Sequence, residues 1–326
     1  MSNQITVIDR NLVPLRLGIL SVATLEQMTE ILTETSENIL IYLNRRGAYK
    51  AYICKDCSHT WKCPHCDVAM TLHTSPKSQL LCHHCHTSLP VPETCPHCHG
   101  HKLSGIGIAV QSVEQFLRNE FPTVEICRLD RDQKNVVATA RIFIGTEYAL
   151  RHHIGKIGVA IALLPESELN IPEFDIEERV YTNIRALGSI SKHCLIETHT
   201  PKLPLIQDIL HGNYKSFLTR TLAERKQYQY PPYAGLAYIR VKHKNIATLE
   251  DICAKINNKL KLEIDKHEGT SNQVLYDRSV RLKRAGEYID TIMIRSPLLL
   301  QILEPIQKEV LRNRSVELMI RGEKIL

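Results

Sequence analysis

Residues 54–66 read CKDCSHTWKCPHC, and residues 82–98 read CHHCHTSLPVPETCPHC. These stretches hold four Cys-x-x-Cys pairs, and the two-residue separation lets both thiolates of a pair reach one metal ion at about 2.3 Å. Eight thiolates complete two tetrahedral sites and leave no open position for catalysis, so the sequence predicts two structural Zn²⁺ ions. The predicted ligands are Cys54, Cys57, Cys63, Cys66, Cys82, Cys85, Cys95 and Cys98.

Spacing alone leaves open which pairs share an ion. Residues 67–81, between the second and third pairs, contain the β-prone stretches VAMTLH and QLL. A hairpin there would bring the two inner pairs together, and the two outer pairs would then share the second ion. The alternatives are pairing in sequential order and a redox-active dithiol.

The remaining composition is that of a globular protein, with 43% hydrophobic and 23% charged residues among 326. Eight of the 11 cysteines fall between residues 54 and 98, which in a reducing compartment indicates metal binding rather than disulfides. No apolar run approaches the roughly 20 residues that span a bilayer, and the first residues, MSNQITVIDRNLVPL, lack the order of a signal peptide. We therefore expect a cytoplasmic protein with no membrane partner.

Helical and strand patterns alternate on both sides of the cysteine-rich stretch. Residues 25–32 have helical spacing, and residues 39–43 (ILIYL) predict a buried strand. Beyond the cysteines, residues 111–121 predict an amphipathic helix, and three further strands are predicted at residues 124–129, 140–144 and 159–164. Helices that alternate with buried strands predict an α/β layer with a largely parallel sheet, into which the zinc module is inserted.

A second unit is predicted from Pro201 onward. Helical patterns over residues 205–229 end at Tyr230-Pro231-Pro232-Tyr233, because proline cannot continue a helix. The order strand, helix, strand, strand, helix, strand that follows is typical of a small α+β domain. The predicted elements lie at residues 235–242, 249–261, 273–282, 288–294, 298–311 and 316–320.

Charge is unevenly spread along the chain. Residues 1–200 carry 19 Lys and Arg against 21 Asp and Glu, whereas residues 201–326 carry 22 against 14. Each tetrathiolate zinc site adds a charge of about −2, so two of them lower the net charge of the chain from +6 to about +2. Electrostatic attraction to nucleic acid must therefore come from the C-terminal third.

Signs of enzymatic chemistry are lacking in the sequence. A nucleotide-driven motor needs a glycine-rich loop around the phosphates, usually GxxxxGK[ST], and the 326 residues contain no such segment. No Ser/His/Asp or Cys/His set stands out either. We expect the solitary Cys127, Cys194 and Cys253 to be buried, inert thiols.

Five sequence elements together are specific enough to identify a family. They resemble, over nearly the whole chain, the C-terminal half of the primosomal protein N′ (PriA) family of bacterial replication-restart DNA helicases. The elements are the four Cys-x-x-Cys pairs, Tyr42–Gly47 (YLNRRG), Arg128–Asp132 (RLDRD), Ala140–Thr146 (ARIFIGT), and Ala223-Glu224-Arg225 with Tyr230–Tyr233.

The resemblance implies a fold and a zinc pairing. Residues 1–53 and 99–200 correspond to a degenerate RecA-like second helicase lobe, residues 54–98 to a zinc-binding insert, and residues 201–326 to a C-terminal DNA-binding α+β domain. In the family the pairing is nested. It assigns Cys54, Cys57, Cys95 and Cys98 to the first zinc ion, and Cys63, Cys66, Cys82 and Cys85 to the second.

The sequence also departs from the family. We expect this polypeptide to lack the family's first lobe, which carries the phosphate-binding lysine. The region that corresponds to the family's QVAGRAGR segment is Asn183–Ser189, which has lost the glycine-arginine pattern; only Arg185 could replace an arginine that reaches the γ-phosphate. The resemblance therefore predicts no ATP site in this chain.

We thus expect a DNA-binding protein of replication restart and primosome assembly that is not a motor by itself. Its partners would be branched or single-stranded DNA, and replication-restart proteins or a separate helicase lobe. One alternative is the C-terminal subunit of a split ATP-dependent helicase, and another is a zinc-scaffolded protein-interaction module. The expected DNA contacts are Asn44, Arg45, Arg46, Arg278, Arg281, Lys283 and Arg284, for which the alternative is a solvated charged surface.

Overall fold

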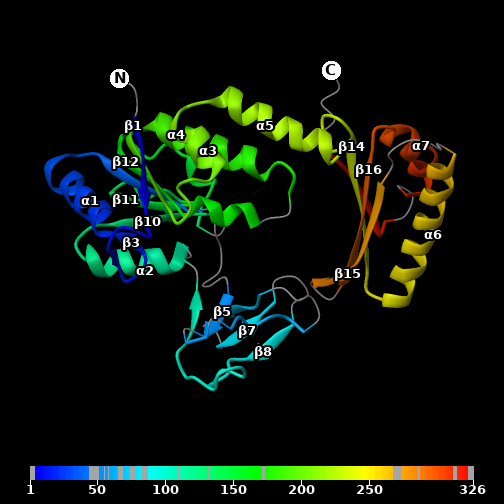
Figure 1. Ribbon diagram of the computed structural model, residues 1–326, viewed down its shortest axis with the longest axis horizontal. Coiled ribbons are helices and arrows are strands. Elements are labelled where there is room, and N and C mark those ends of the chain that lie inside the picture. Colours follow the sequence, from blue (N-terminus) through cyan, green and yellow to red (C-terminus); the bar gives the residue numbers. More distant parts are fainter. Residues whose placement is uncertain are drawn as a thin grey trace. The chain divides into compact units, whose positions relative to one another are not determined.

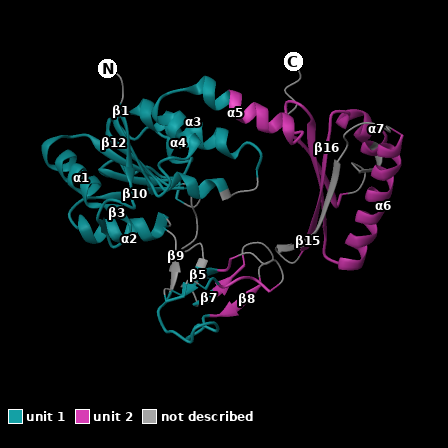
Figure 2. Ribbon diagram, viewed as in Figure 1, with its two compact units in different colours: residues 1–60, 71–79, 91–218 teal, residues 61–70, 80–90, 219–326 magenta. Residues whose placement is uncertain are grey.

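The computed structural model of the chain contains two compact units (Figure 2). Unit 1 comprises Met1–Thr60, Thr71–Gln79 and Val91–Leu218, and unit 2 comprises Trp61–Met70, Leu80–Pro90 and Thr219–Leu326. The structure describes residues 4–43, 51–54, 56–57, 59–64, 69–73, 78–82, 87–106, 108, 110–130, 133–170, 173–266, 273–284, 287–310 and 314–321.

Unit 1 is organised around a six-stranded sheet of described residues in which every pairing is parallel. The order across the sheet is β1-β13-β12-β4-β11-β10, so the first strand along the chain lies beside the last. The strands are β1 (Gln4–Asp9), β4 (Asn38–Tyr42), β10 (Ile126–Leu129), β11 (Ile142–Gly145), β12 (Ile157–Leu163) and β13 (Ser191–Thr198).

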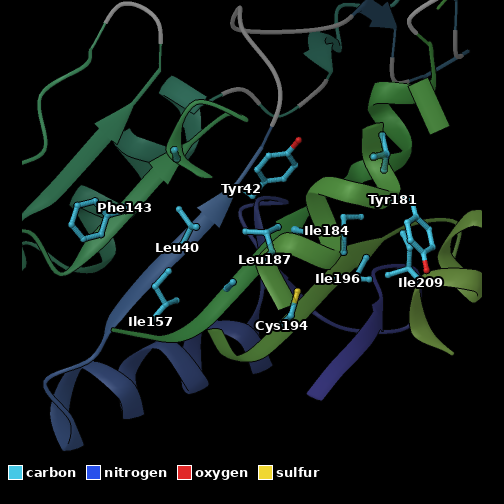
Figure 3. Close-up of a cluster of buried hydrophobic side chains, with 14 of the residues drawn as sticks. Leu40, Tyr42, Phe143, Ile157, Tyr181, Ile184, Leu187, Cys194, Ile196 and Ile209 are labelled. Atoms are coloured by element: carbon cyan, nitrogen blue, oxygen red, sulfur yellow. The ribbon is translucent and has the colours of Figure 1, made fainter. Parts of the chain in front are cut away.

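Helices cover both faces of this sheet (Figure 1). Alternate residues of β4 supply the two cores. Ile39 and Ile41 pack with α1 (Val22–Glu34) and α2 (Val110–Glu120), while Leu40 and Tyr42 pack on the other side with α3, α4 and the start of α5 (Figure 3). Those three helices span Ile176–Ile190, Pro204–Leu210 and Tyr214–Gln227. Burial on both faces explains why the central strands read as continuous apolar runs.

A buried ion pair fixes one end of the sheet. Arg10 follows β1 and donates to the carboxylate of Glu197 near the end of β13, and both side chains are at most 1% exposed. The same carboxylate accepts the backbone N–H of Ser21 at 2.9 Å and the Thr24 hydroxyl at 2.6 Å, at the N-terminus of α1. The pair therefore ties β1, β13 and α1 together.

The predicted α/β layer with a parallel sheet is confirmed, but the sequence missed several of its elements. The strands β1 and β13 and the helix α3 were not predicted. The helical pattern over residues 205–229 is interrupted between α4 and α5, where Gly212 has φ +63°, a conformation that favours glycine.

Short strands frame the cysteine-rich module. The strands β5 (Ala51–Cys54) and β9 (Leu103–Ile106) pair antiparallel where the chain enters and leaves it. Inside it, β6 (Thr71–His73), β7 (Gln79–Leu81) and β8 (Ser88–Pro90) form a sheet in that order. The neighbouring β6 and β7 agree with the hairpin expected for residues 67–81. Near the N-terminus, β2 (Leu15–Arg16) pairs with β3 (Leu20–Ser21).

Unit 2 contains a four-stranded antiparallel sheet with helices on one face. The strand order is β15-β16-β14-β17, and the core lies between this sheet and two helices. The first residue of β14 is Gly235, and glycine suits this position because a Cβ there would lie 2.7 Å from the Cβ of Leu299 in α7. The elements are β14 (Gly235–His243), α6 (Ile246–Asp265), β15 (Gln273–Arg284), β16 (Glu287–Ser296), α7 (Leu299–Val310) and β17 (Val316–Arg321).

The remaining described helices are two 3₁₀ turns, η1 (Ala149–Arg151) and η2 (Pro165–Asn170), each of which follows a strand of the parallel sheet. Among the helices that the structure describes, none combines the length and the apolar character that crossing a bilayer requires.

Candidate metal centre

The outer cysteine pairs come together in space although they are far apart in sequence. The Sγ atoms of Cys54, Cys57, Cys95 and Cys98 all lie within 4.8 Å of one another. The Cys54–Cys98 and Cys57–Cys95 sulfur distances are both 3.6 Å. Four thiolates at about 2.3 Å from a central ion stand about 3.8 Å apart in a tetrahedron. The four sulfur atoms are therefore gathered at close to the spacing that one zinc ion requires.

The local fold of each pair explains how the thiols are presented. The backbone N–H of Cys54 donates to His59 O, that of Cys82 to Thr87 O, and that of Cys95 to Gly100 O, each at 2.9 Å. In all three cases the donor and the acceptor are five positions apart in the sequence, and the sulfur atoms of the two outer pairs lie together in one cluster. The repeat of this bond indicates that the pairs are copies of one metal-binding turn.

Close packing around the outer cluster depends on one glycine. A Cβ at Gly100 would lie 2.4 Å from Asp56 Oδ2 and 3.3 Å from Cys98 Sγ. The same Asp56 carboxylate forms an ion pair with Lys102 at 3.3 Å. A side chain at this position would therefore displace the Asp56 carboxylate.

Electrostatics in the cluster suit a dication. Burial raises the pKa of Cys95, but hydrogen bonds from the backbone of Cys98 and His97 and from neighbouring thiols outweigh it and lower the pKa to about 7. A hydrogen bond from the His59 backbone favours the Cys57 thiolate, yet burial and the adjacent thiols raise its pKa to about 12. One thiolate thus forms readily and the next ones resist, as expected for crowded anions. A bound Zn²⁺ removes that repulsion.

The inner cysteines are only half described. Cys63 and Cys82 are buried, whereas Cys66 and Cys85 lie outside the described residues. The structure brings together the outer four ligands that the sequence predicts and gives no geometry for the inner set.

The predicted DNA contacts also fall largely outside the description. Asn44, Arg45 and Arg46 are not among the described residues. The other four predicted residues belong to β15. Only the backbone of that strand is described, so the positions of their side chains are outside the description. In β15 the pairing with β16 is irregular between Asp277 and Leu282, the segment that contains Arg278 and Arg281.

The RLDRD motif builds an ion-pair network beside the edge strand β10. Arg128 reaches Glu114 at 3.2 Å and Asp130 at 3.1 Å, and Arg118 reaches the same glutamate at 2.9 Å. Glu114, Arg118 and Arg128 border a polar pocket of about 490 Å³ that Glu125 and Lys134 also line. Three cations and two carboxylates line the pocket, so its net charge is only slightly positive.

A buried hydrogen bond connects the YLNRRG motif to α3, and the sequence did not predict it. Asn183 Nδ2 donates to Tyr42 Oη at 2.9 Å. Burial, together with the charge of Glu168, raises the pKa of Tyr42 above its usual range. Part of the segment that corresponds to QVAGRAGR therefore has a structural role, while Arg185 is exposed. Cys127, Cys194 and Cys253 are buried, as expected.

Comparisons with known proteins agree with the cysteine pattern. Residues 63–90 match the family model described as the PriA DNA helicase Cys-rich region (CRR) domain. The chain is similar to "Replication restart protein PriA" of Bacillus subtilis, with 29% identity over 89% of this chain and 39% of the relative. The protein of the same name from Chlamydia muridarum is 31% identical over 72% of this chain and 34% of the relative. The one from Haemophilus influenzae is 26% identical over 92% of this chain and 44% of the relative.

These matches confirm the resemblance to PriA that the sequence motifs indicated. The chain spans about two fifths of the length of the curated relatives that it matches.

Proposed function

Because this chain is a relative of replication restart protein PriA along most of its length, we propose that it is a DNA-binding protein of replication restart and primosome assembly. Two findings together carry the proposal. Similarity covers 89% of the chain in one relative, and four thiols from opposite ends of the cysteine-rich module meet in a zinc-sized cluster. The zinc ions would hold the module together rather than take part in a reaction.

The domain assignment is part of this proposal. Residues 1–53 and 99–200 would be a degenerate RecA-like second helicase lobe, and the all-parallel sheet with helices on both faces supports that assignment. Residues 54–98 would be the zinc-binding insert and residues 201–326 the DNA-binding α+β domain. The surplus of positive charge in residues 201–326, 22 Lys and Arg against 14 Asp and Glu, supports nucleic-acid binding by the last domain.

Two zinc ions are proposed, held by Cys54, Cys57, Cys95 and Cys98 and by Cys63, Cys66, Cys82 and Cys85. The sulfur distances support the first site. The family match over residues 63–90 spans all four inner cysteines and supports the second. Bound zinc supplies cross-links between turns that have few apolar residues of their own.

We propose further that this polypeptide alone does not hydrolyse ATP. Its sequence contains no GxxxxGK[ST] segment, and Asn183–Ser189 lies inside α3, where Asn183 is engaged with Tyr42. A DNA-stimulated ATPase assay on the zinc-loaded chain is expected to give no turnover above a variant with unfolded zinc module. Steady turnover that survives repurification would contradict this proposal.

DNA binding is tested on the whole zinc-loaded chain by fluorescence anisotropy with forked and single-stranded DNA over a salt series. We expect log Kd to rise linearly with log salt concentration, because phosphate contacts release counterions. Neutralising Arg278 and Arg281 together should lower the slope by roughly 1.5. Absence of binding to either DNA at low salt would contradict the proposal and favour a protein-interaction module.

A further inference from the structure

The sheet of unit 2 has two different faces. On β14, Ala237, Ile239 and Val241 point to the core with α6 and α7. Because strand residues alternate, the intervening Tyr238, Arg240 and Lys242 lie on the opposite surface, which we call the helix-free face. All three are only partly buried.

Strand register assembles the helix-free face in rows. Tyr238 lies opposite Met293 of β16 and Met319 of β17, so an aromatic ring has a thioether on each side. The adjacent row places Arg240 between Thr291 and Glu317. A central ring next to a row that contains a cation is the arrangement on which an unpaired base stacks while its phosphate meets that cation.

A second aromatic group closes one end of this face. Arg295 of β16 lies in register with Leu236, and the ring of Tyr230 lies 4.6 Å from its guanidinium carbon. This distance is within the range of a cation–π interaction. Positive charge and aromatic surface are thus combined at this end as well.

The charge of the helix-free face is strongly biased on the three strands β14, β16 and β17. On the helix-free face, within the rows from Leu236 to Lys242, the cations are Arg240, Lys242, Arg321 and the buried Arg295, and Glu317 is the one acidic side chain described. Charge complementarity therefore favours an anionic occupant. The central aromatic ring favours one with exposed bases, which is single-stranded DNA rather than a duplex.

Glu317 forms ion pairs with both Lys242 and Arg240. One of its carboxylate oxygens forms a hydrogen-bonded ion pair with Lys242, and the other lies 3.7 Å from Arg240. The two cations hold the pKa of Glu317 below its usual range, so the carboxylate stays ionised near neutral pH. The side chains of Arg240, Lys242 and Glu317 are 38%, 31% and 48% exposed, which makes the pairs accessible to exchange.

We propose that single-stranded DNA crosses the helix-free face, with a base stacked on Tyr238 and a phosphate bound by Arg240 and Lys242, and that Glu317 competes with that phosphate. This inference rests on the proposed DNA binding and adds its surface, the unpaired form of the strand and an internal competitor. It predicts that removing the carboxylate of Glu317 strengthens DNA binding.

The test uses the full zinc-loaded chain and a fluorescent oligothymidylate of 20 nucleotides, measured over a salt series. Glu317→Gln is expected to tighten binding about 2- to 5-fold, since exposed ion pairs of this kind are weak and readily exchanged. Arg240→Gln should weaken binding and lower the log–log salt slope by about 0.7. Tyr238→Leu should weaken binding by at least about 5-fold with an unchanged slope, whereas Tyr238→Phe should retain affinity.

A matched control separates a local effect from net charge. Asp251→Asn makes the same change in net charge on α6, where Asp251 pairs with Lys255 and both are exposed. It should alter affinity by less than about 2-fold, because exposed charges farther than a Debye length of about 10 Å are screened. Far-UV circular dichroism and zinc content confirm that each variant is folded.

The outcomes distinguish this inference from the proposed function. If Glu317→Gln and Asp251→Asn increase the affinity for DNA equally, the effect comes from net charge alone. The proposed competition between Glu317 and a phosphate would then be wrong. Salt-dependent binding that is indifferent to Tyr238→Leu and Arg240→Gln would place DNA elsewhere and leave the proposed function intact. No binding of oligothymidylate or forked DNA by the unaltered chain would remove both.

Discussion

The buried pair of Arg10 and Glu197 provides a quantitative test of what holds unit 1 together. Glu197→Ala would leave a guanidinium that is 1% exposed without its carboxylate. It would also remove the acceptor of the Ser21 N–H and of the Thr24 hydroxyl. Breaking a buried pair by deleting one partner costs about 3–5 kcal/mol, and each orphaned polar group about 1–3 kcal/mol. Because Arg10 keeps bonds to Gly18 O and Ile19 O, we expect a loss of about 4 kcal/mol.

Hydrogen exchange followed by mass spectrometry suits this measurement, because a chain with two units need not unfold in one step. Peptides that cover β12 and β13 report the free energy of opening of the sheet. The matched control lies on the same strand: Lys192 is 65% exposed and pairs with Glu37, so Lys192→Ala should cost less than about 1 kcal/mol. Replacing both Arg10 and Glu197 by leucine should recover much of the loss. If Glu197→Ala costs no more than Lys192→Ala, the reasoning is refuted.

Three further outcomes are expected. Cys95→Ser should lower bound zinc by one ion per chain in elemental analysis while Cys127→Ser, a buried thiol far from the cluster in sequence, leaves it unchanged; the same loss in both would contradict the outer site. Gly100→Ala should speed zinc release to a chelator, and adding Asp56→Ala should slow it again, because the new Cβ meets that carboxylate; no recovery would argue against the packing. Tyr42 has a raised pKa, so its neutral form stabilises the fold fully below pH 10 and this contribution is lost as the pH rises further; Tyr42→Phe should flatten the alkaline loss of stability, and superimposable unfolding profiles would refute this.

Local sequence patterns predicted those elements whose hydrophobic period is visible by itself. The run at Val159–Leu164 became β12, buried along its whole length. The helix α3 has apolar residues at Val180, Ile184 and Leu187, which is helical spacing. This spacing was visible in the sequence, although no helix was predicted there.

The unpredicted part of the fold depends on contacts between distant residues. A six-residue segment such as β1 has too weak a sequence pattern to be recognised as a strand, because its conformation depends on pairing with β13. The same holds for the candidate site. Each Cys-x-x-Cys turn is local, but the meeting of Cys54 with Cys98 depends on the antiparallel pairing of β5 with β9. The strand β14 was predicted, and the alternation of Ala237, Ile239 and Val241 with more polar residues indicates its buried face, but its pairing with β16 and β17 was not predicted.

The pairing of the first strand with the last has a consequence for synthesis. Arg10 and Glu197 are separated by 187 positions, and β1 cannot complete its hydrogen bonds before β13 has left the ribosome. At about 5–20 residues per second, that delay is on the order of 10–40 s. During this time the backbone N–H and C=O groups of β1 are available to other chains. A nascent polypeptide of this topology therefore leaves β1 open to intermolecular pairing until β13 has been synthesised.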